Sequence, residues 1–204
     1  MAYEHDVFVS YKRDLETLHW LGEHFVPLLA HRLSLELGRE VDIYVHEITA
    51  HITPGASWPL ELGRELASSR TLIALWTRTY FNSRWCTEEM CRMLAREKET
   101  GCRTAENSYG LVVPMVIHDG EDFPQDLEHV QRIELKRVYN TRMRRDSARA
   151  EELSDIFYCL RNSLMSCTSM HLKPKSASTP SRMTQRSRYS VGCEIPENCA
   201  LSEG

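Results

Sequence analysis

The chain has 204 residues, of which 42% are hydrophobic and 26% are charged, and its formal net charge is −4. This length is enough to bury one hydrophobic core, with or without an additional tail. The slightly acidic balance gives no global charge signal for nucleic acid or an anionic membrane, so we expect neither as a partner. No stretch approaches roughly 18 consecutive apolar residues and the first residues do not form a signal peptide, which predicts a soluble, cytoplasmic protein.

The cysteines and histidines give no sign of a structural metal or of a disulfide framework. The seven cysteines are an odd number, and no two of them form a Cys-x-x-Cys pair. Neither a zinc ribbon nor a set of disulfides is therefore predicted. His46 and His51 lack a third ligand at a suitable spacing, so no metal is expected there.

Five short apolar runs alternate with amphipathic segments along the first part of the chain. They are rich in β-branched residues and lack polar alternation, which is typical of strands that are covered on both faces. The predicted strands are residues 6–11, 41–45, 71–76, 111–117 and, with a weaker pattern, 132–135. Pro114 removes a backbone donor from the fourth run and therefore predicts an edge strand or a bulge.

The segments between these runs predict helices. Residues 25–37 carry an apolar stripe at helical spacing and end at Gly38, while Pro27 fits only in a first turn or at a kink. Residues 16–24 are therefore predicted as a separate turn. The other predicted helices are residues 57–68, 84–97 and 147–164. Strand and helix alternate about five times, which predicts a doubly wound α/β domain with a mainly parallel sheet.

The composition changes after about residue 165, where serine, threonine and proline become frequent and no apolar period remains. We predict a domain over residues 1–164 and a disordered tail or linker over residues 165–204. The basic run from Lys173 to Arg188 is typical of a solvated tail, and contact with an anionic partner is the alternative.

The third predicted helix carries two adjacent glutamates, Glu88 and Glu89. At about 100° per residue, four apolar side chains of this helix form one contiguous arc: Cys86, Met90, Met93 and Leu94. Glu89 falls at the flank of this arc, one turn above Trp85, whereas Glu88 faces away toward solvent. A partly desolvated carboxylate beside an indole should have a raised pKa. The alternative for Glu89 is an ordinary ion pair with Arg92 or Arg96.

Three segments of the chain resemble the sequence boxes of TIR (Toll/interleukin-1 receptor) domains. They are DVFVSYKRD at 6–14, ITPGASWPLELGREL at 52–66 and WTRTYFNSRWCTEEM at 76–90. The Trp-Cys-x-x-Glu box is the most specific element, and Pro54-Gly55 followed by Trp58 is most similar to bacterial TIR proteins. The resemblance covers roughly residues 3–162 and implies a flavodoxin-like fold, with five parallel strands in the order 2-1-3-4-5.

The resemblance also implies an activity. Many TIR domains cleave NAD+ at the bond between nicotinamide and ribose, and their catalytic glutamate corresponds to Glu89 here. NAD+ would be the substrate, with no cofactor. A single carboxylate is chemically sufficient because nicotinamide leaves as a neutral molecule from a cationic ring and needs no general acid, unlike the leaving oxygen of a glycoside. The carboxylate would hold the ribose and stabilise the oxocarbenium ion.

Candidate substrate-binding residues follow from the same comparison and from the geometry of parallel sheets, which bind ligands at the carboxyl ends of their strands. Phe8 and Ser10 lie at that end of the first strand, with core packing and a turn hydrogen bond as their alternatives. Lys12 or Arg13 would contact the pyrophosphate. The remaining candidates are aromatic residues for ring stacking and a serine just before the Trp-Cys-x-x-Glu box: Tyr11, Trp58, Trp85 and Ser83. For Trp58, packing at the start of its helix is the alternative.

Two functions remain open at this point. The first is an NAD+ glycohydrolase or cyclase in cell-suicide or antiphage immune signalling, and the second is a non-catalytic TIR module that recruits other TIR domains. Both imply self-association, because TIR active sites are commonly completed by a neighbouring copy.

Departures from related patterns limit these alternatives. No Gly-x-Gly-x-x-Gly follows the first strand, so NAD+ would not be a redox cofactor in a Rossmann site. The loop after the second strand has His46-Glu47 in place of the aspartate common in TIR domains. A phosphate receiver of the response-regulator kind shares the topology, but it needs clustered aspartates where this chain has only Asp14.

Overall fold

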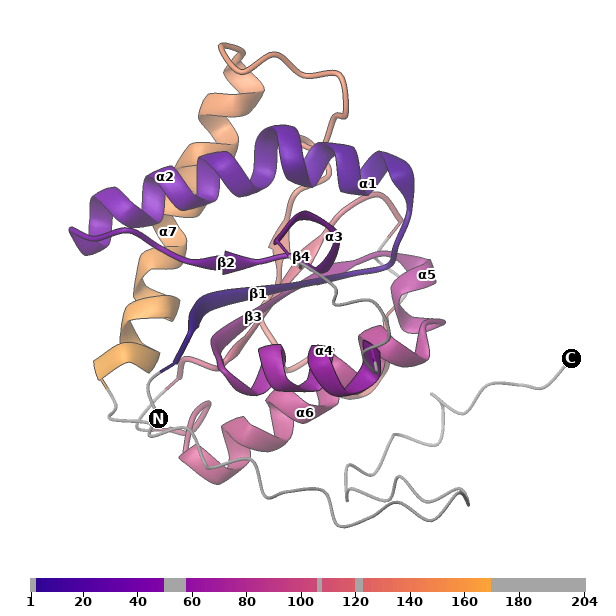
Figure 1. Ribbon diagram of the computed structural model, residues 1–204, viewed down its shortest axis with the longest axis vertical. Coiled ribbons are helices and arrows are strands. Elements are labelled where there is room, and N and C mark those ends of the chain that lie inside the picture. The colour runs from indigo at the N-terminus through magenta and orange to yellow at the C-terminus, as the bar shows by residue number, and fades with distance from the viewer. Residues whose placement is uncertain (1–2, 50–57, 106–107, 120–122, 170–204) are drawn as a thin grey trace, which may run out of the picture.

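The computed structural model describes residues 3–49, 58–105, 108–119 and 123–169. Five parallel strands form one sheet in the order β2-β1-β3-β4-β5, which confirms the predicted doubly wound flavodoxin-like topology (Figure 1). The strands are β1 (His5–Tyr11), β2 (Ile43–Tyr44), β3 (Ser69–Trp76), β4 (Val112–Val116) and β5 (Ile133–Glu134). β1 and β3 are the longest neighbours and are almost fully buried, as expected for strands covered on both faces.

Helices cover both faces of the sheet. One face packs against α1 (Leu15–Trp20), α2 (Val26–Leu37) and α7 (Ala148–Ser169), and the other against α4 (Trp58–Ala67) and α6 (Arg84–Thr100). The remaining helical segments are the π-helix η1 (Leu21–Phe25), α3 (His46–Thr49), α5 (Arg78–Phe81) and the 3₁₀ helix η2 (Gln125–Leu127). Alternate residues of β1 enter the two cores, with Val7 and Val9 on the α2 side and Phe8 on the α6 side.

The chain from Leu15 to Leu37 is helical throughout, so the separate turn predicted for residues 16–24 is wrong. Pro27 does lie in the first turn of α2, as predicted. It is preceded by the π-helix η1, in which the Val26 N–H donates to the Leu21 carbonyl, five residues back. This wider turn makes room for a proline ring that would otherwise clash with a preceding carbonyl.

Pro114 lies in β4, which has a neighbour on each side, so the expectation of an edge strand is wrong. Ile117 donates to the carbonyl of Trp76 on β3, and the two-residue alternation of a parallel strand then turns the Pro114 nitrogen toward β5. The pairing with β5 begins only at Met115. The missing donor therefore falls just before the short β5 ladder and breaks no pairing with β3.

The last helix is longer than predicted. The expected apolar face is present, since Leu153, Phe157 and Leu160 are buried, but α7 continues beyond residue 164 to Ser169. The predicted start of the tail at residue 165 thus lies inside this helix, and residues 170–204 lie outside the described residues. Within the part of the chain that the structure describes, no helix is long and apolar enough to cross a membrane.

Candidate active site

The candidate site lies where β1 ends and α6 begins, at the carboxyl edge of the sheet. Ser10 points toward the α6 side, on the same face of β1 as Phe8. The first turn of α6 approaches the end of β1 closely, because the thiol of Cys86 donates to the carbonyl of Tyr11 at 3.4 Å. Glu89, almost one turn further along α6, therefore lies beside Ser10, whose hydroxyl lowers the pKa of this carboxyl by hydrogen bonding.

Glu89 is half-buried at this edge, and its pKa is raised to about 7. Burial is the main cause, because it penalises the charged form of the carboxyl. The hydrogen bond from Ser10 and the positive charge of Arg92 lower the pKa, whereas the charges of Glu47 and Glu88 raise it. A carboxyl poised near neutrality at the ligand-binding edge of an α/β sheet is a candidate functional group.

Two buried hydroxyl groups, those of Ser10 and Tyr80, form a hydrogen-bonded chain beside Glu89. The Ser10 hydroxyl lies 2.9 Å from the Tyr80 hydroxyl, which lies 3.2 Å from the carbonyl oxygen of Cys86. Each hydroxyl has one proton to donate. When Glu89 is ionised, Ser10 donates to it and Tyr80 donates to Ser10. When Glu89 is protonated, the carboxyl can donate to Ser10, Ser10 to Tyr80, and Tyr80 to the carbonyl oxygen of Cys86. The chain thus accommodates both protonation states of the carboxyl.

A second carboxylate, Glu47 on α3, lies beside the first. It accepts a hydrogen bond from the hydroxyl of Tyr11, and its Oε1 lies 2.8 Å from Nε of Arg13. The side chain of Glu47 is 16% exposed, whereas that of Arg13 is 76% exposed. Burial, together with the adjacent Glu47, raises the pKa of Tyr11 above its usual range. Two of the predicted binding residues, Tyr11 and Arg13, are therefore joined to each other through Glu47.

The other predicted residues differ in their surroundings. Phe8 is buried and its ring stacks on that of Tyr44, with centroids 5.1 Å apart, so its described contacts are those of core packing. Ser83 is buried just before α6, near the thiol of Cys86. Lys12 is exposed beside the site, whereas Trp85 is 40% exposed on the first turn of α6. Lys12 and Trp85 are thus accessible from solvent.

The helical face predicted for α6 agrees with the structure. Cys86, Met90 and Met93 are buried, and Leu94 packs against the same core. Glu88 is less solvated than predicted, because it forms an ion pair with Arg84, 2.9 Å from its Nε.

The expected alternative for Glu89, an ion pair with a nearby arginine, is not formed within the described part of the chain. Arg96 instead donates to the carbonyls of Ala67 and Ser69, at 3.3 Å and 2.6 Å. Arg92 influences Glu89 through its charge alone.

Part of the predicted site cannot be placed. Trp58 opens α4, but its side chain lies outside the described residues, as do residues 50–57 with His51 and the Pro54-Gly55 pair. The roles predicted for these residues therefore stay predictions. Conversely, sequence reasoning missed Glu47 and Tyr80 as members of the site. The only signal for Glu47 was its place in the loop where TIR domains commonly carry an aspartate.

A family model and several solved structures are similar to this chain. The family model described as TIR domain matches residues 7–153, more than two thirds of the chain. A search of curated proteins gave no match. Among solved structures, the chain is similar to the TIR domain of the Toll-related receptor TRR-2 from Hydra magnipapillata, with 14% identity and a TM-score of 0.49 over 80% of this chain and 98% of that one.

Two further structures are similar over most of this chain. One is a metazoan TIR-STING receptor from C. gigas in complex with 2',3'-cGAMP, with 15% identity and a TM-score of 0.46 over 76% of this chain and 40% of that one. The other is the set of TIR domains in the activated Roq1 resistosome that recognises the effector XopQ, with 18% identity and a TM-score of 0.38 over 82% and 85% of the two chains. Because the family model matches most of this chain, the chain belongs to the TIR domain family.

Proposed function

We propose that this protein is an NAD+ glycohydrolase of the TIR family, with Glu89 as its catalytic residue. The observation that carries the proposal is the state of this carboxyl. It is half-buried at the carboxyl edge of the sheet, its pKa is raised to about 7, and among the described residues it is the Ser10 hydroxyl that lowers this pKa by hydrogen bonding. A carboxylate that only stabilised the fold would gain from a guanidinium partner, and Glu89 has none among the described residues.

In the proposed reaction, the bond between ribose C1′ and the nicotinamide nitrogen breaks and its electron pair stays with the ring nitrogen. The cationic pyridinium ring thereby leaves as neutral nicotinamide, and positive charge develops on the ribose. The Glu89 carboxylate stabilises this oxocarbenium ion. Water then adds to C1′ and loses a proton, which gives ADP-ribose; attack by a ring nitrogen of the adenine would give a cyclic product instead.

The surroundings of Glu89 suit such a substrate. Glu47 and Glu88 add negative charge near the carboxyl, which favours the cationic nicotinamide ring and the oxocarbenium ion. Two exposed side chains support this proposal: Trp85 would stack on a ring of the substrate, and the ammonium group of Lys12 would contact the pyrophosphate. We further propose that self-association completes the site and that NAD+ loss serves cell-suicide or antiphage signalling.

Nicotinamide release from NAD+ by the purified chain tests the proposal, at several protein concentrations up to the highest attainable. Glu89→Gln keeps the shape of the side chain and removes its charge, and we expect release to fall at least about 100-fold. Glu88→Gln is the matched control, because it changes the neighbouring glutamate on the same helix, and it should retain most of the activity. Equal loss in both variants would contradict the assignment to Glu89. No release from the wild type, even when it is forced to oligomerise, would favour the non-catalytic TIR module.

A further inference from the structure

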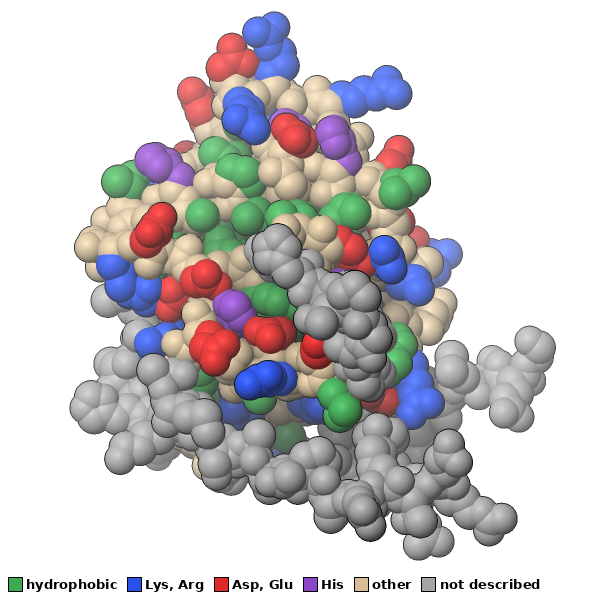
Figure 2. Space-filling view, viewed as in Figure 1, with side chains coloured by type: hydrophobic (Ala, Val, Ile, Leu, Met, Phe, Trp, Pro, Cys, Tyr) green, Lys and Arg blue, Asp and Glu red, His purple; other side chains and the backbone are tan. Residues whose placement is uncertain are grey.

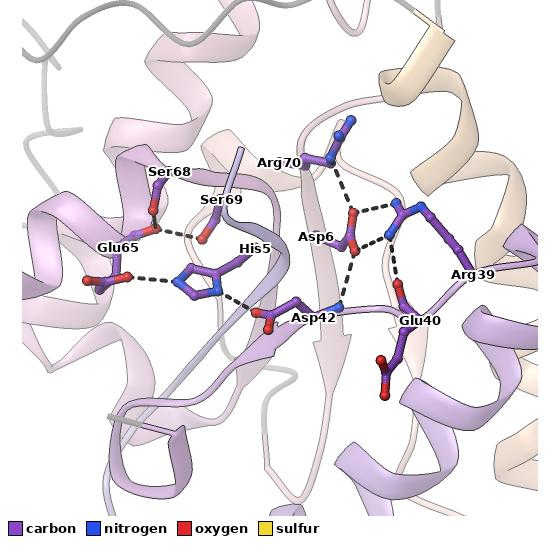
Figure 3. Close-up of polar contacts among 9 residues, drawn as sticks. All are labelled: His5, Asp6, Arg39, Glu40, Asp42, Glu65, Ser68, Ser69 and Arg70. Atoms are coloured by element: carbon purple, nitrogen blue, oxygen red, sulfur yellow. Dashed lines mark hydrogen bonds and ion pairs between the residues drawn. The ribbon is translucent and has the colours of Figure 1, made fainter. Parts of the chain in front are cut away.

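A second group of ionisable side chains lies at the amino end of β1, at the end of the sheet opposite to the candidate active site. His5 is the first residue of β1 and lies between two carboxylates (Figure 3). Its Nδ1 contacts Oδ1 of Asp42, just before β2, and its Nε2 lies 2.7 Å from Oε2 of Glu65 on α4. Figure 2 shows acidic side chains gathered around a histidine on this face of the molecule.

The spacing of this group fits a single metal ion. One ligand atom each from Glu4, His5 and Glu65 lie within 4.8 Å of one another. Three ligands that each lie about 2.0–2.2 Å from a common ion are separated by about 3–4 Å, so small side-chain adjustments bring them into range. Glu4 directly precedes His5, the first residue of β1, and Glu65 approaches from α4, so the ligands come from two separate parts of the fold.

We propose that Glu4, His5 and Glu65 form a binding site for a divalent transition ion of the zinc class. Imidazole nitrogen combined with carboxylate oxygen suits zinc, whereas calcium and magnesium prefer oxygen ligands alone. Asp42 has the place that a carboxylate commonly takes behind a metal-binding histidine, on the ring nitrogen away from the ion. It would fix the ring so that Nε2 faces Glu4 and Glu65.

The local charge also favours a cation. Three carboxylates surround one imidazole, and two arginines of neighbouring segments bind a different carboxylate, that of Asp6. Arg39 binds Asp6 through both of its terminal nitrogens, and Arg70 contacts the same carboxylate at 3.2 Å, as the right half of Figure 3 shows. The ion would displace the proton from Nε2 of His5 and join β1 to α4. This role is structural and independent of the function proposed for Glu89.

Titration of the reduced full-length chain with Zn²⁺, followed by calorimetry, tests the site. We expect one strongly bound equivalent, which Mg²⁺ does not displace. His5→Gln and Glu65→Gln should abolish it, and Asp42→Asn should weaken it about tenfold, as is usual for a residue behind a ligand. The chain has nine histidines and seven cysteines, so His31→Gln, which changes an exposed histidine of α2, is the control for binding elsewhere.

Glu4→Gln separates a metal site from a simple ion-pair cluster. In the described part of the chain, the exposed carboxylate of Glu4 has no hydrogen bond or ion pair of its own, so its loss should leave the metal-free fold unchanged. If Glu4 is a ligand, this variant binds Zn²⁺ at least about tenfold more weakly. Zn²⁺ should also raise the unfolding temperature of the wild type but not that of Glu65→Gln. Unchanged affinity in Glu4→Gln and Glu65→Gln, or no strong equivalent in the wild type, would overturn the proposal.

Discussion

Helix α6 carries two glutamates in opposite situations. Near its carboxyl end, Glu97 is only 3% exposed, and both of its oxygens are bound by the guanidinium of Arg103 at 3.0 Å. It also accepts a hydrogen bond from the backbone N–H of Val112 at 2.7 Å. Near the amino end of the helix, Glu89 is less deeply buried, and within the described ranges it has the Ser10 hydroxyl beside it and no guanidinium in an ion pair with it. Burial alone therefore does not distinguish a structural carboxylate from a functional one. The distinguishing feature is how far hydrogen bonds and ion pairs offset the cost of burying the charge.

Replacing Glu97, the carboxylate paired with a guanidinium, should destabilise the fold more than replacing Glu89. Glu97→Gln would leave the guanidinium of Arg103, which is 20% exposed, without its partner. Breaking such a pair by removing one side is strongly destabilising, and we expect a loss of about 3 kcal/mol in the free energy of unfolding. Urea denaturation measures this change. The control is Glu88→Gln, whose ion pair with Arg84 is more exposed and should be worth about 0.5 kcal/mol or less.

For Glu89, replacing the carboxylate by an amide should instead increase the free energy of unfolding at high pH. The pKa of Glu89 rises from 4.5 to about 7 on folding, so the folded state binds its proton more tightly. The contribution of Glu89 to the free energy of unfolding is therefore fully present below pH 4.5 and is lost as the pH rises through about 7. Glu89→Gln should thus be more stable than the wild type well above pH 7, by on the order of 2 kcal/mol, and equally stable below 4.5. Urea denaturation at both pH values is the measurement; a variant that is less stable at high pH would break the comparison.

The contrast between these two glutamates was only half predictable from sequence. The position of Glu89 at the flank of an apolar arc depends on the pitch of a single helix, and this pitch is the same in every α-helix. The pairing of Glu97 depends on Arg103, which lies in a loop beyond the helix with a φ of 55°. No local pattern indicates that a non-glycine residue will adopt this conformation.

The same division holds for the rest of the fold. Strand positions followed from apolar runs, but the order of the strands came from the family resemblance, because runs alone do not tell which strands are neighbours. The π-helix η1 was missed since its wider turn breaks the helical period on which the prediction relied. Tyr80 bonds Ser10, and Glu47 acts on Glu89 through its charge, because α5 and α3 lie near the ends of the strands; no spacing in the sequence encodes this arrangement.

Ser10, whose hydroxyl lies beside Glu89, gives a finer test of the comparison. Ser10→Ala removes the hydrogen bond that lowers the pKa of this carboxyl, so the pKa should rise further. If the ionised form is the catalytic one, the acidic limb of the activity profile should move to higher pH, while the activity at high pH is largely retained. Nicotinamide release measured across the pH range would reveal the shift. An unchanged limb would mean that Ser10 does not contact the carboxylate in the active state.

The smallest effect should come from Glu47, and its direction should be opposite. The negative charge of Glu47 raises the pKa of Glu89, so Glu47→Gln should move the acidic limb of the same profile to lower pH. The amide can still accept the hydrogen bond from Tyr11, whereas Arg13 loses its ion-pair partner and stays in solvent. Since Ser10 and Glu47 act on one carboxyl with opposite signs, the double variant should lie between the two single variants. Shifts of equal sign in both single variants would show that the limb reports a group other than Glu89, and the contrast with Glu97 would then carry no information about catalysis.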